Sequence, residues 1–333
     1  MNARITGTGS VLPDTKLTNA DLESLVETDD EWIVERTGIR ERGKVEEGEA
    51  TSHLAARAAR GALELAGVAP SELDLIVVGT VSPDMITPAT ACFLHRHLRV
   101  GRPIACFDIG AACSGFLYGL EVVSDLLASG RYRRALLVGG ETITRFIDYE
   151  DRGTCILFGD AAGAVILEAT DGPGGVRSSL LKADGEFWDL IHIPGGGSLQ
   201  PATTSMISQR QQFLRMNGRQ VFKLAVQNLE QISHEVLDRT GWALEDVDHV
   251  LVHQANLRII EVVASRLGVP EEKVHVNIDR TGNTSAATIP TLLDEVNRAG
   301  KLKPGDKILC AAFGAGLTWA AVTIEWTAPQ VGS

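Results

Sequence analysis

The sequence has little of several features that mark whole classes of protein. No apolar run in its 333 residues reaches the about 18 residues that span a bilayer, which excludes a membrane-spanning helix. The opening residues show no basic and then apolar leader, so we expect no signal peptide. The five cysteines are few, odd in number and without C-x-x-C spacing, which argues against a disulfide framework or a zinc site. We therefore expect a cytoplasmic protein that binds no metal.

Basic side chains are also few in relation to acidic ones. The chain has 31 lysines and arginines against 43 aspartates and glutamates, and its formal charge is −12. Such a charge argues against non-specific binding to nucleic acid or to anionic membranes, so neither is an expected partner. Hydrophobic residues make up 44% of the chain, which is ordinary for a globular protein. The length alone suggests roughly two domains.

The second half of the chain repeats the pattern of the first. Apolar strands and strand–turn–helix segments recur in the same order, including an expected strand over 274–277. Position 74 corresponds to 248, 113 to 283 and 136 to 308, which are offsets of 174, 170 and 172 residues. We interpret this as an internal duplication of an α/β unit, with halves at 1–170 and 176–333. Mostly parallel sheets with helices between and outside them are expected.

The stretch 104–120 has the features of a nucleophile turn. A short apolar run passes through small residues into a helical pattern with Leu117 and Leu120 on one face. Cys113 therefore falls between a buried strand and the N-terminus of a helix, whose free N–H groups favour a thiolate. Small neighbours leave room for a substrate near the sulfur. A cysteine that only fills a gap in the core is the alternative interpretation.

Two further polar residues fall at strand ends. His253 follows an apolar strand, and Asn283 lies in a turn that corresponds to the turn of Cys113. Each alone has an ordinary explanation, as a buried hydrogen-bonded histidine or as a helix N-cap. Binding sites in open α/β sheets gather at the carboxyl ends of strands. We therefore expect the three side chains to meet in one cleft.

A Cys/His/Asn set suits two kinds of chemistry. In a thiol protease, the histidine acts as a base and the asparagine orients it. Here the asparagine belongs to its own strand–turn–helix segment, so it is better placed to donate to a substrate. Two neutral donors, an imidazole Nε2–H and an amide NH₂, would stabilise a developing enolate. This set favours carbon–carbon bond formation by a thioester carbanion over hydrolysis.

Five motifs in this chain resemble those of the β-ketoacyl-acyl carrier protein synthase III family, and they occur in the expected order. They are Thr28–Arg40, Ala111–Phe116, His253–Arg258, Gly282–Ala287 and Phe313–Trp319. The resemblance runs from Ile5 to Trp319. It implies a homodimer and a thiolase-like duplicated α/β fold, with mixed, mostly parallel five-stranded sheets in a layered αβαβα arrangement.

The resemblance implies that the enzyme initiates fatty acid synthesis in two half-reactions without a cofactor. Cys113 would take an acyl group from acyl-CoA. Malonyl-acyl carrier protein would then bind and lose CO₂ while His253 and Asn283 hold its thioester oxygen. The carbanion would attack the acyl-Cys113 thioester, whose oxygen lies in an oxyanion hole formed by the backbone N–H groups of Cys113 and Ala315. Relatives often carry glycine where this chain has Ala315.

The resemblance also implies how CoA is bound. Trp32 and Arg152 would hold the adenine, and Thr28, Arg36 and Asn256 would line the tunnel for the rest of CoA. An aromatic ring and arginines at a tunnel mouth suit an adenine and phosphates. Without the resemblance, these residues would be interpreted as an exposed helix residue and solvated charges.

Two further sites follow from the resemblance. Lys223, Arg258 and Arg266 are candidates for a basic patch that docks the acidic carrier protein. Phe313 and Thr87 would border the acyl pocket, and Thr87 would reach it across a dimer interface. Acetyl-specific relatives carry a bulky aromatic residue at the position of Thr87, so we expect this chain to accept primers longer than acetyl.

Three other functions remain open on the sequence. A related enzyme of polyketide or other secondary metabolism, or one that transfers acyl groups without decarboxylation, would carry the same residues. A silent acyl-CoA or carrier-protein binding module would need none of the three candidate catalytic residues. A thiol hydrolase would use them to form a free acid.

Overall fold

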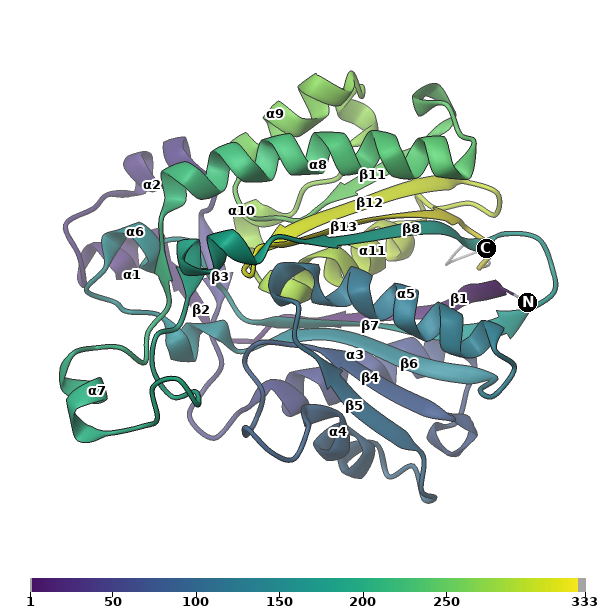
Figure 1. Cartoon of the computed structure of the whole chain (residues 1–333), viewed down its shortest axis with the longest axis horizontal. Helices are drawn as coiled ribbons and strands as arrows, with labels where there is room; N and C mark the ends of the chain where they lie inside the picture. The colour runs from purple at the N-terminus through teal and green to yellow at the C-terminus, as the bar shows by residue number, and fades with distance from the viewer. Residues whose placement is uncertain (1, 329–333) are drawn as a thin grey trace.

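The computed structural model describes residues 2–328 and contains two larger sheets (Figure 1). The first sheet has the order β1-β7-β6-β4-β5, and the second has the order β8-β13-β12-β11. The strands of the first are β1 (Asn2–Val11), β4 (Leu75–Gly79), β5 (Ala105–Ile109), β6 (Arg134–Glu141) and β7 (Ala161–Thr170). Those of the second are β8 (Gly175–Ala183), β11 (His249–Val252), β12 (Lys307–Gly314) and β13 (Thr318–Glu325). Two small ribbons pair β2 (Lys16–Thr18) with β3 (Glu41–Gly43) and β9 (Ile191–His192) with β10 (Arg215–Met216).

The two sheets share one topology. In the first, β7 is antiparallel to β1 and β6, whereas β4 is parallel to β6 and β5. In the second, β13 is antiparallel to β8 and β12, whereas β11 is parallel to β12. Val274 forms an isolated parallel bridge with Val250 where the counterpart of β5 would lie. The duplication expected from the sequence is therefore confirmed.

The same hydrogen bonds recur at the starts of equivalent strands. The Asp74 N–H donates to the Arg134 carbonyl at 2.9 Å, and the Asp248 N–H donates to the Lys307 carbonyl at 2.8 Å. The side chain of each aspartate also accepts a hydrogen bond from the backbone N–H of the same residue. The Arg134 N–H donates to Asp74 at 3.2 Å, and the Lys307 N–H donates to Asp248 at 2.8 Å. Positions 74 and 248 were matched by the sequence repeat.

The expectation of mixed, mostly parallel sheets holds for strand direction, because β7 and β13 are the strands that run against the others in their sheets. The expectation of five strands is wrong for the second sheet. The first sheet has five strands with two parallel and two antiparallel pairs, and the second has four strands with one parallel pair. The expected strand 274–277 makes only the Val274 bridge, because the chain enters helix α10 (Ile278–Thr281) immediately afterwards. A continuous apolar run indicates a buried strand but does not give its direction.

Helices form the other layers. α3 (Thr51–Ala66) and α4 (Thr90–Leu98) cover the outer face of the first sheet, and α8 (Gly218–Thr240) and α9 (Leu257–Leu267) cover the outer face of the second. α5 (Gly115–Ala128) and α11 (Thr288–Arg298) lie between the sheets (Figure 1). The layered αβαβα arrangement is thus confirmed. The short helices are α1 (Asn19–Glu23), α2 (Asp30–Thr37), α6 (Arg152–Cys155) and α7 (Thr204–Ser208).

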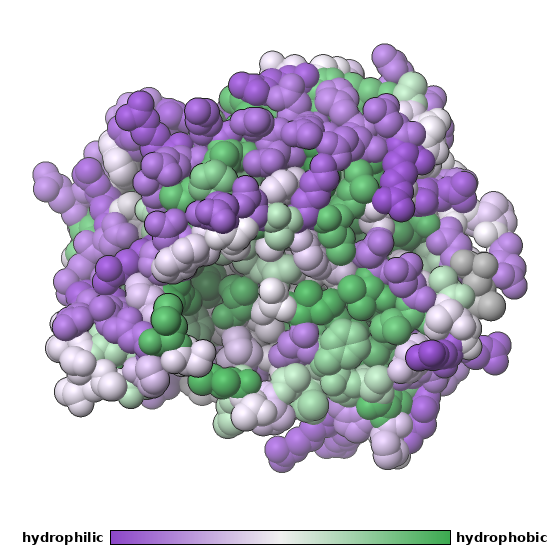
Figure 2. Space-filling view, in the orientation of Figure 1, coloured by the Kyte–Doolittle hydropathy of each residue, from purple (hydrophilic) through white to green (hydrophobic). Residues whose placement is uncertain are grey.

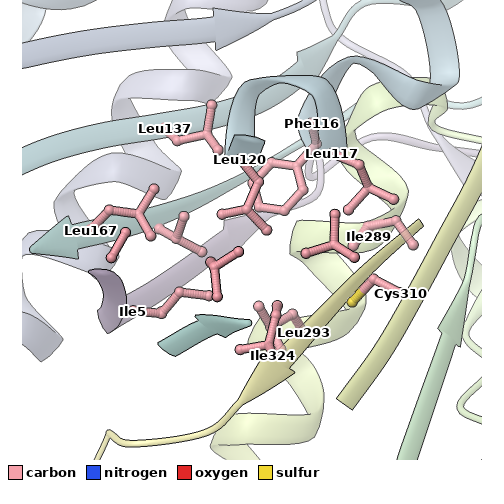
Figure 3. Packing of buried hydrophobic residues seen from close by; sticks show 14 of the residues in the cluster. Ile5, Phe116, Leu117, Leu120, Leu137, Leu167, Ile289, Leu293, Cys310 and Ile324 are labelled. Carbon is pink, nitrogen blue, oxygen red and sulfur yellow. The ribbon is translucent and has the colours of Figure 1, made fainter. Parts of the chain in front are cut away.

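The largest hydrophobic core lies between the two sheets. Leu117 and Leu120 of α5 and Ile289 and Leu293 of α11 pack there against both sheets (Figure 3). Close approach of α11 requires a glycine on β6, because a Cβ at Gly139 would lie 2.2 Å from the Ala286 carbonyl oxygen. The core thereby fixes the turns that precede α5 and α11, which carry candidate site residues.

No helix within residues 2–328 is both long enough and apolar enough to cross a membrane. All five cysteines are free thiols.

Candidate active site

A cavity of about 790 Å³ brings together the three residues of the expected catalytic set. Cys113, His253 and Asn283 all line it. Much of the remaining wall is apolar, including Val81, Ile143, Ile156, Leu157, Phe158, Ile191, Leu214, Val221, Leu229 and Ile259. The cavity therefore combines a nucleophile and polar donors with space for a hydrophobic chain.

Cys113 lies in a tight turn between β5 and α5. The turn is a 3-10 segment over Ala112–Ser114, and Gly115 begins α5. Burial raises the pKa of the Cys113 thiol to about 12, while a hydrogen bond with the Ser285 side chain acts in the opposite direction. The helix N-terminus favours the thiolate. Burial and the helix N-terminus therefore act in opposite directions on the pKa of this thiol.

Backbone strain marks the turns on both sides of the site. Ala112 has φ 46° and Ser285 has φ 49°, a left-handed conformation that residues other than glycine rarely adopt. The two positions lie 173 residues apart and occupy equivalent 3-10 turns, at Ala112–Ser114 and Ser285–Ala287. The sequence match of Cys113 with Asn283 is therefore three residues out, although the two turns do correspond.

His253 follows β11 and is 2% exposed. Its backbone N–H donates to the Ala311 carbonyl at 2.8 Å, and its Nδ1 lies 2.7 Å from the Thr288 hydroxyl at the start of α11. Burial lowers the pKa of His253 to about 3, so the ring is neutral at physiological pH. Since Thr288 occupies Nδ1, Nε2 is the nitrogen left for the cavity.

Asn283 is held by hydrogen bonds of its backbone and side chain. Its N–H donates to the Leu157 carbonyl at 2.8 Å, and its carbonyl accepts from Gly159 at 3.0 Å. Its Oδ1 accepts from the Ser285 N–H at 2.9 Å. With Oδ1 engaged in this turn, the Nδ2 amide group is the part of Asn283 that can donate to a bound molecule.

The backbone around residue 314 closes on the nucleophile. Phe313, Gly314 and Ala315 line the cavity, and a Cβ at Gly314 would lie 2.6 Å from the Cys113 nitrogen. The Thr318 hydroxyl lies 3.0 Å from the Ala111 carbonyl and 3.1 Å from the Ala315 carbonyl. The loop that carries Ala315 is thereby packed directly against the turn of Cys113.

Three of the five expected CoA-binding residues line the cavity. The Trp32 ring lies 4.6 Å from the Arg36 guanidinium carbon and 4.5 Å from that of Arg152. Trp32, Arg36 and Asn256 line the cavity, and the Asn256 side chain donates to the Arg36 carbonyl at 3.0 Å. Arg152 and Thr28 do not line it. The buried Thr28 hydroxyl has no hydrogen-bond partner within the described residues.

The expected docking residues are more scattered. Arg258 on α9 lines the cavity and lies 3.5 Å from the Glu35 carboxylate. Arg266 pairs with Glu230 at 2.9 Å, and it and the exposed Lys223 lie outside the cavity lining. Sequence reasoning missed Arg219, which lines the cavity and precedes Lys223 by one helical turn on α8.

The expected acyl-pocket residues are separated. Phe313 lines the cavity, whereas Thr87 does not. Thr87 is exposed, as are its neighbours Met85 (56%) and Ile86 (91%). Thr87 is therefore not part of the acyl pocket of its own chain.

Sequence reasoning also missed two polar residues that contact the catalytic set and a third that contacts one of these two. Thr288 contacts His253, Ser285 contacts Cys113 and Asn283, and Glu141 contacts Ser285. Glu141 had one usable signal, since it is an acidic residue at the end of an apolar strand. Within residues 2–328, no three His, Cys, Asp or Glu side chains are grouped so that they could hold a metal ion.

Comparison with known proteins identifies the family. The family described as 3-oxoacyl-[acyl-carrier-protein] synthase III matches residues 107–185, and its C-terminal family matches residues 237–326. A β-ketoacyl-[acyl-carrier-protein] synthase III from Roseiflexus sp. (strain RS-1) is 48% identical over 326 residues, which cover 98% of this chain and 99% of the relative. The one from Desulfitobacterium hafniense (strain Y51) is 46% identical over 97% of both chains.

Solved structures agree. The 3-oxoacyl-[acyl-carrier-protein] synthase III from Aquifex aeolicus VF5 has a TM-score of 0.90 and 42% identity, covering 97% of this chain and all of that one. A priming β-ketosynthase from the R1128 polyketide pathway has a TM-score of 0.91 and 34% identity, covering 98% and 97%. The resemblance carried by the sequence motifs is confirmed. This chain is a condensing acyltransferase and belongs to the 3-oxoacyl-[acyl-carrier-protein] synthase III family.

Proposed function

We propose that this enzyme joins an acyl-CoA primer to malonyl-acyl carrier protein through an acyl-Cys113 intermediate, and so initiates fatty acid synthesis. The observation that carries the proposal is the single cavity lined by Cys113, neutral His253 and Asn283. A neutral imidazole and an amide suit the stabilisation of an enolate, which needs donors that do not give up a proton. The reaction needs no metal or organic cofactor, and the enzyme acts in the cytoplasm.

In the first half-reaction, the Cys113 sulfur attacks the thioester carbonyl of acyl-CoA. The developing oxyanion accepts hydrogen bonds from the backbone N–H groups of Cys113 and Ala315. The close packing of Gly314 against Cys113 supports this arrangement. CoA leaves, and the acyl chain remains on the sulfur with its tail along the apolar wall.

In the second half-reaction, His253 and Asn283 donate to the thioester oxygen of the malonyl group as CO₂ leaves. This role requires the proton of the neutral ring to be on Nε2. The Thr288 hydroxyl lies 2.7 Å from Nδ1 and 3.1 Å from the Ser285 carbonyl, which can only accept. Thr288 meets the requirement when it donates its single proton to Nδ1 rather than to this carbonyl. The carbanion then attacks the acyl carbonyl on Cys113, and the new carbon–carbon bond forms as the carbon–sulfur bond breaks.

CoA binds over Trp32, with Arg152 and Arg36 on the ring and Asn256 along the tunnel. The pairing of both arginines with the Trp32 ring supports this site, because an adenine can take the place of a guanidinium on an aromatic face. Thr28 supplies a hydroxyl for CoA. This role is supported by the buried Thr28 hydroxyl, which has no hydrogen-bond partner within the described residues.

The carrier protein docks at the cavity mouth beside α8 and α9. Lys223, Arg258 and Arg266 provide positive charge on a protein whose formal charge is −12. Arg219 extends the patch, because it lies one helical turn before Lys223 and lines the cavity. Opposite charges steer the acidic carrier to this mouth.

The enzyme is a homodimer that pairs through β5, and each chain comprises two similar halves at 1–170 and 176–333. Within the described residues β5 pairs on one side only, and its five residues are all partly exposed. Figure 2 shows hydrophobic residues gathered on the face where Figure 1 places α5 and β5. An unpaired apolar strand edge of this kind favours association with another chain.

Primers longer than acetyl are accepted. Across the proposed dimer, Thr87 reaches the acyl pocket of the partner, and its small side chain leaves that pocket open. The exposure of Met85, Ile86 and Thr87 supports this arrangement, since solvent is a costly environment for two large apolar side chains.

Intact-mass measurements test the proposal. Incubation with an acyl-CoA adds one acyl group to wild type and none to Cys113→Ala. Addition of malonyl-acyl carrier protein then removes the adduct and yields CO₂ and a 3-oxoacyl-carrier product. An adduct that persists contradicts the condensation, and free acid as the only product indicates a hydrolase.

A second candidate is primer condensation for a polyketide pathway. The structural likeness to the R1128 priming enzyme favours it, but that enzyme is 34% identical to this chain, whereas the Aquifex aeolicus and Roseiflexus relatives are 42% and 48% identical. Rates with the carrier proteins of the two pathways distinguish these functions.

A further inference from the structure

A fully buried carboxyl group lies behind the nucleophile, and the mechanism above does not use it. Glu141 ends β6 and is 0% exposed. No cation pairs with it in the part of the chain that the structure describes. A carboxylate without a counter-ion is costly to bury, so it calls for a functional explanation.

Five donors surround this carboxyl group. The Ser285 hydroxyl reaches Oε1 at 3.1 Å, and the Val81 N–H reaches it at 3.2 Å. The Thr80 hydroxyl and the Ser82 N–H each reach Oε2 at 3.1 Å, and the Ser82 hydroxyl donates there as well. These bonds hold Oε1 towards Ser285 and leave the carboxyl group no freedom to turn away.

Ser285 links this carboxyl group to the catalytic thiol. Its hydroxyl donates to Glu141 Oε1 at 3.1 Å. Ser285 lines the same cavity as Cys113, and its side chain lowers the pKa of the Cys113 thiol. The backbone of Ser285 is fixed by its N–H bond to Asn283 at 2.9 Å and by its left-handed conformation. Ser285 therefore joins the buried carboxyl group to the cavity that contains the nucleophile.

The thiol needs a base, and the alternative base is poorly suited. Burial raises the pKa of Cys113 to about 12, so it must lose a proton to attack. Burial lowers the pKa of His253 to about 3, so its ring is a weak base. Burial raises the pKa of Glu141 to about 7, which places it near the working pH.

We propose that Glu141 accepts the thiol proton of Cys113 through the Ser285 hydroxyl during transfer of the primer. As the sulfur–carbon bond to the acyl group forms, the Cys113 proton passes to Ser285 Oγ and the Ser285 proton passes to Glu141 Oε1. As the carbon–sulfur bond to CoA breaks, the Ser285 proton passes to the CoA sulfur and Glu141 returns its proton to Ser285 Oγ. This inference rests on the proposed function, because it concerns the first half-reaction.

Single-turnover acylation of the full chain tests the relay. Rapid quenching and intact mass follow the Cys113 adduct formed with an acyl-CoA between pH 5.5 and 9. For wild type, the rate rises with pH through an inflection near 7. For Glu141→Gln and for Ser285→Ala, we expect the rate to fall by about 100-fold and the inflection to disappear. Ala112 already adopts the Ser285 conformation, so Ser285→Ala is compatible with the fold.

Asp160→Asn is the matched control. Asp160 is also 0% exposed and bound to the Thr144 hydroxyl at 2.6 Å, but it lies outside the cavity lining. The acylation rate and pH profile of the Asp160→Asn enzyme are expected to match those of wild type. Decarboxylation by a previously acylated Glu141→Gln enzyme is also expected to match wild type, because His253 and Asn283 are intact.

The outcomes separate the two proposals. If wild type forms no adduct, the proposed function itself fails. If wild type is acylated and both variants keep its rate and its inflection, the relay is wrong and the proposed function stands. A loss of rate in Asp160→Asn as large as in Glu141→Gln also overturns the relay, because it assigns the effect to structure alone.

Discussion

Single atoms decide the geometry around Cys113. Gly314 is the clearest case, since a Cβ there would lie 2.6 Å from the Cys113 nitrogen and 3.0 Å from its Cβ. The atoms in the way are a backbone nitrogen and a Cβ whose position the backbone fixes, so they cannot rotate aside. The site has no space for one additional methyl group at this point.

We predict that Gly314→Ala lowers the free energy of unfolding by about 1–3 kcal/mol and strongly slows acylation of Cys113. Gly197→Ala is the control, because its Cβ would meet no atom within 4 Å and its backbone needs no left-handed conformation. Denaturant titration and intact mass measure the two effects. Equal stability of the two variants would show that the loop moves freely.

A second prediction concerns the tautomer of His253. Thr288→Val removes the hydroxyl that lies 2.7 Å from Nδ1 but keeps the branched shape. We expect release of CO₂ from malonyl-acyl carrier protein to fall by about ten-fold or more, because the ring no longer holds its proton on Nε2. Acylation of Cys113 is expected to continue at the wild-type rate. Unchanged release of CO₂ would exclude a role for Thr288.

The sequence predicted the three catalytic candidates but not their hydrogen-bond partners. Cys113, His253 and Asn283 stand at the ends of recognisable strands, where the fold class alone places binding sites. Ser285 meets Glu141 across 144 positions of the chain. No local pattern encodes such a contact, because it depends on how α11 packs against the first sheet.

At the scale of elements, the short segment before α4 tests the proposed dimer. Thr87 is exposed and lies outside the cavity of its own chain. We predict that Thr87→Phe leaves stability unchanged but shifts primer preference towards acetyl-CoA, because the ring fills the partner's acyl pocket. Initial rates with acyl-CoA from two carbons to about twelve measure the shift. An unchanged preference would contradict the dimer-spanning pocket.

The type of each element was predictable, but the position of the reversed strand in each sheet was not. Apolar runs located β4, β6, β11 and β12, and the repeat showed that they occur in matching pairs. Both halves place one reversed strand, β7 or β13, between two neighbours that are each antiparallel to it. The order of the strands in each sheet depends on contacts between segments far apart in the chain. It therefore cannot be predicted from the apolar runs alone.

At the scale of the whole molecule, buried histidines couple stability to pH. His275 is 9% exposed, and its Nε2 lies 2.9 Å from His249 Nδ1, whose other nitrogen lies 3.1 Å from Asp306. Burial, together with His249 and Lys301, lowers the pKa of His275 to about 4. Between about pH 6.5 and 4, the unfolded chain therefore binds a proton that the folded chain does not, and acid favours unfolding.

We predict that His275→Gln reduces this sensitivity. Between pH 7.5 and 5, wild type is expected to lose about 2 kcal/mol more of its unfolding free energy than the variant, because a depressed histidine contributes stability only above its ordinary pKa. Chemical denaturation at the two pH values measures the difference. Equal losses would show that His275 is protonated without penalty in the folded chain.

The central claim is that a thiol from one half and two neutral donors from the other act in sequence in one cavity. Release of CO₂ from malonyl-acyl carrier protein by the pre-acylated Asn283→Ala enzyme tests it most directly. The account predicts normal acylation of Cys113 and a fall in CO₂ release of about 100-fold to 1,000-fold, as for the loss of one oxyanion donor. Wild-type release of CO₂ by this variant would contradict it.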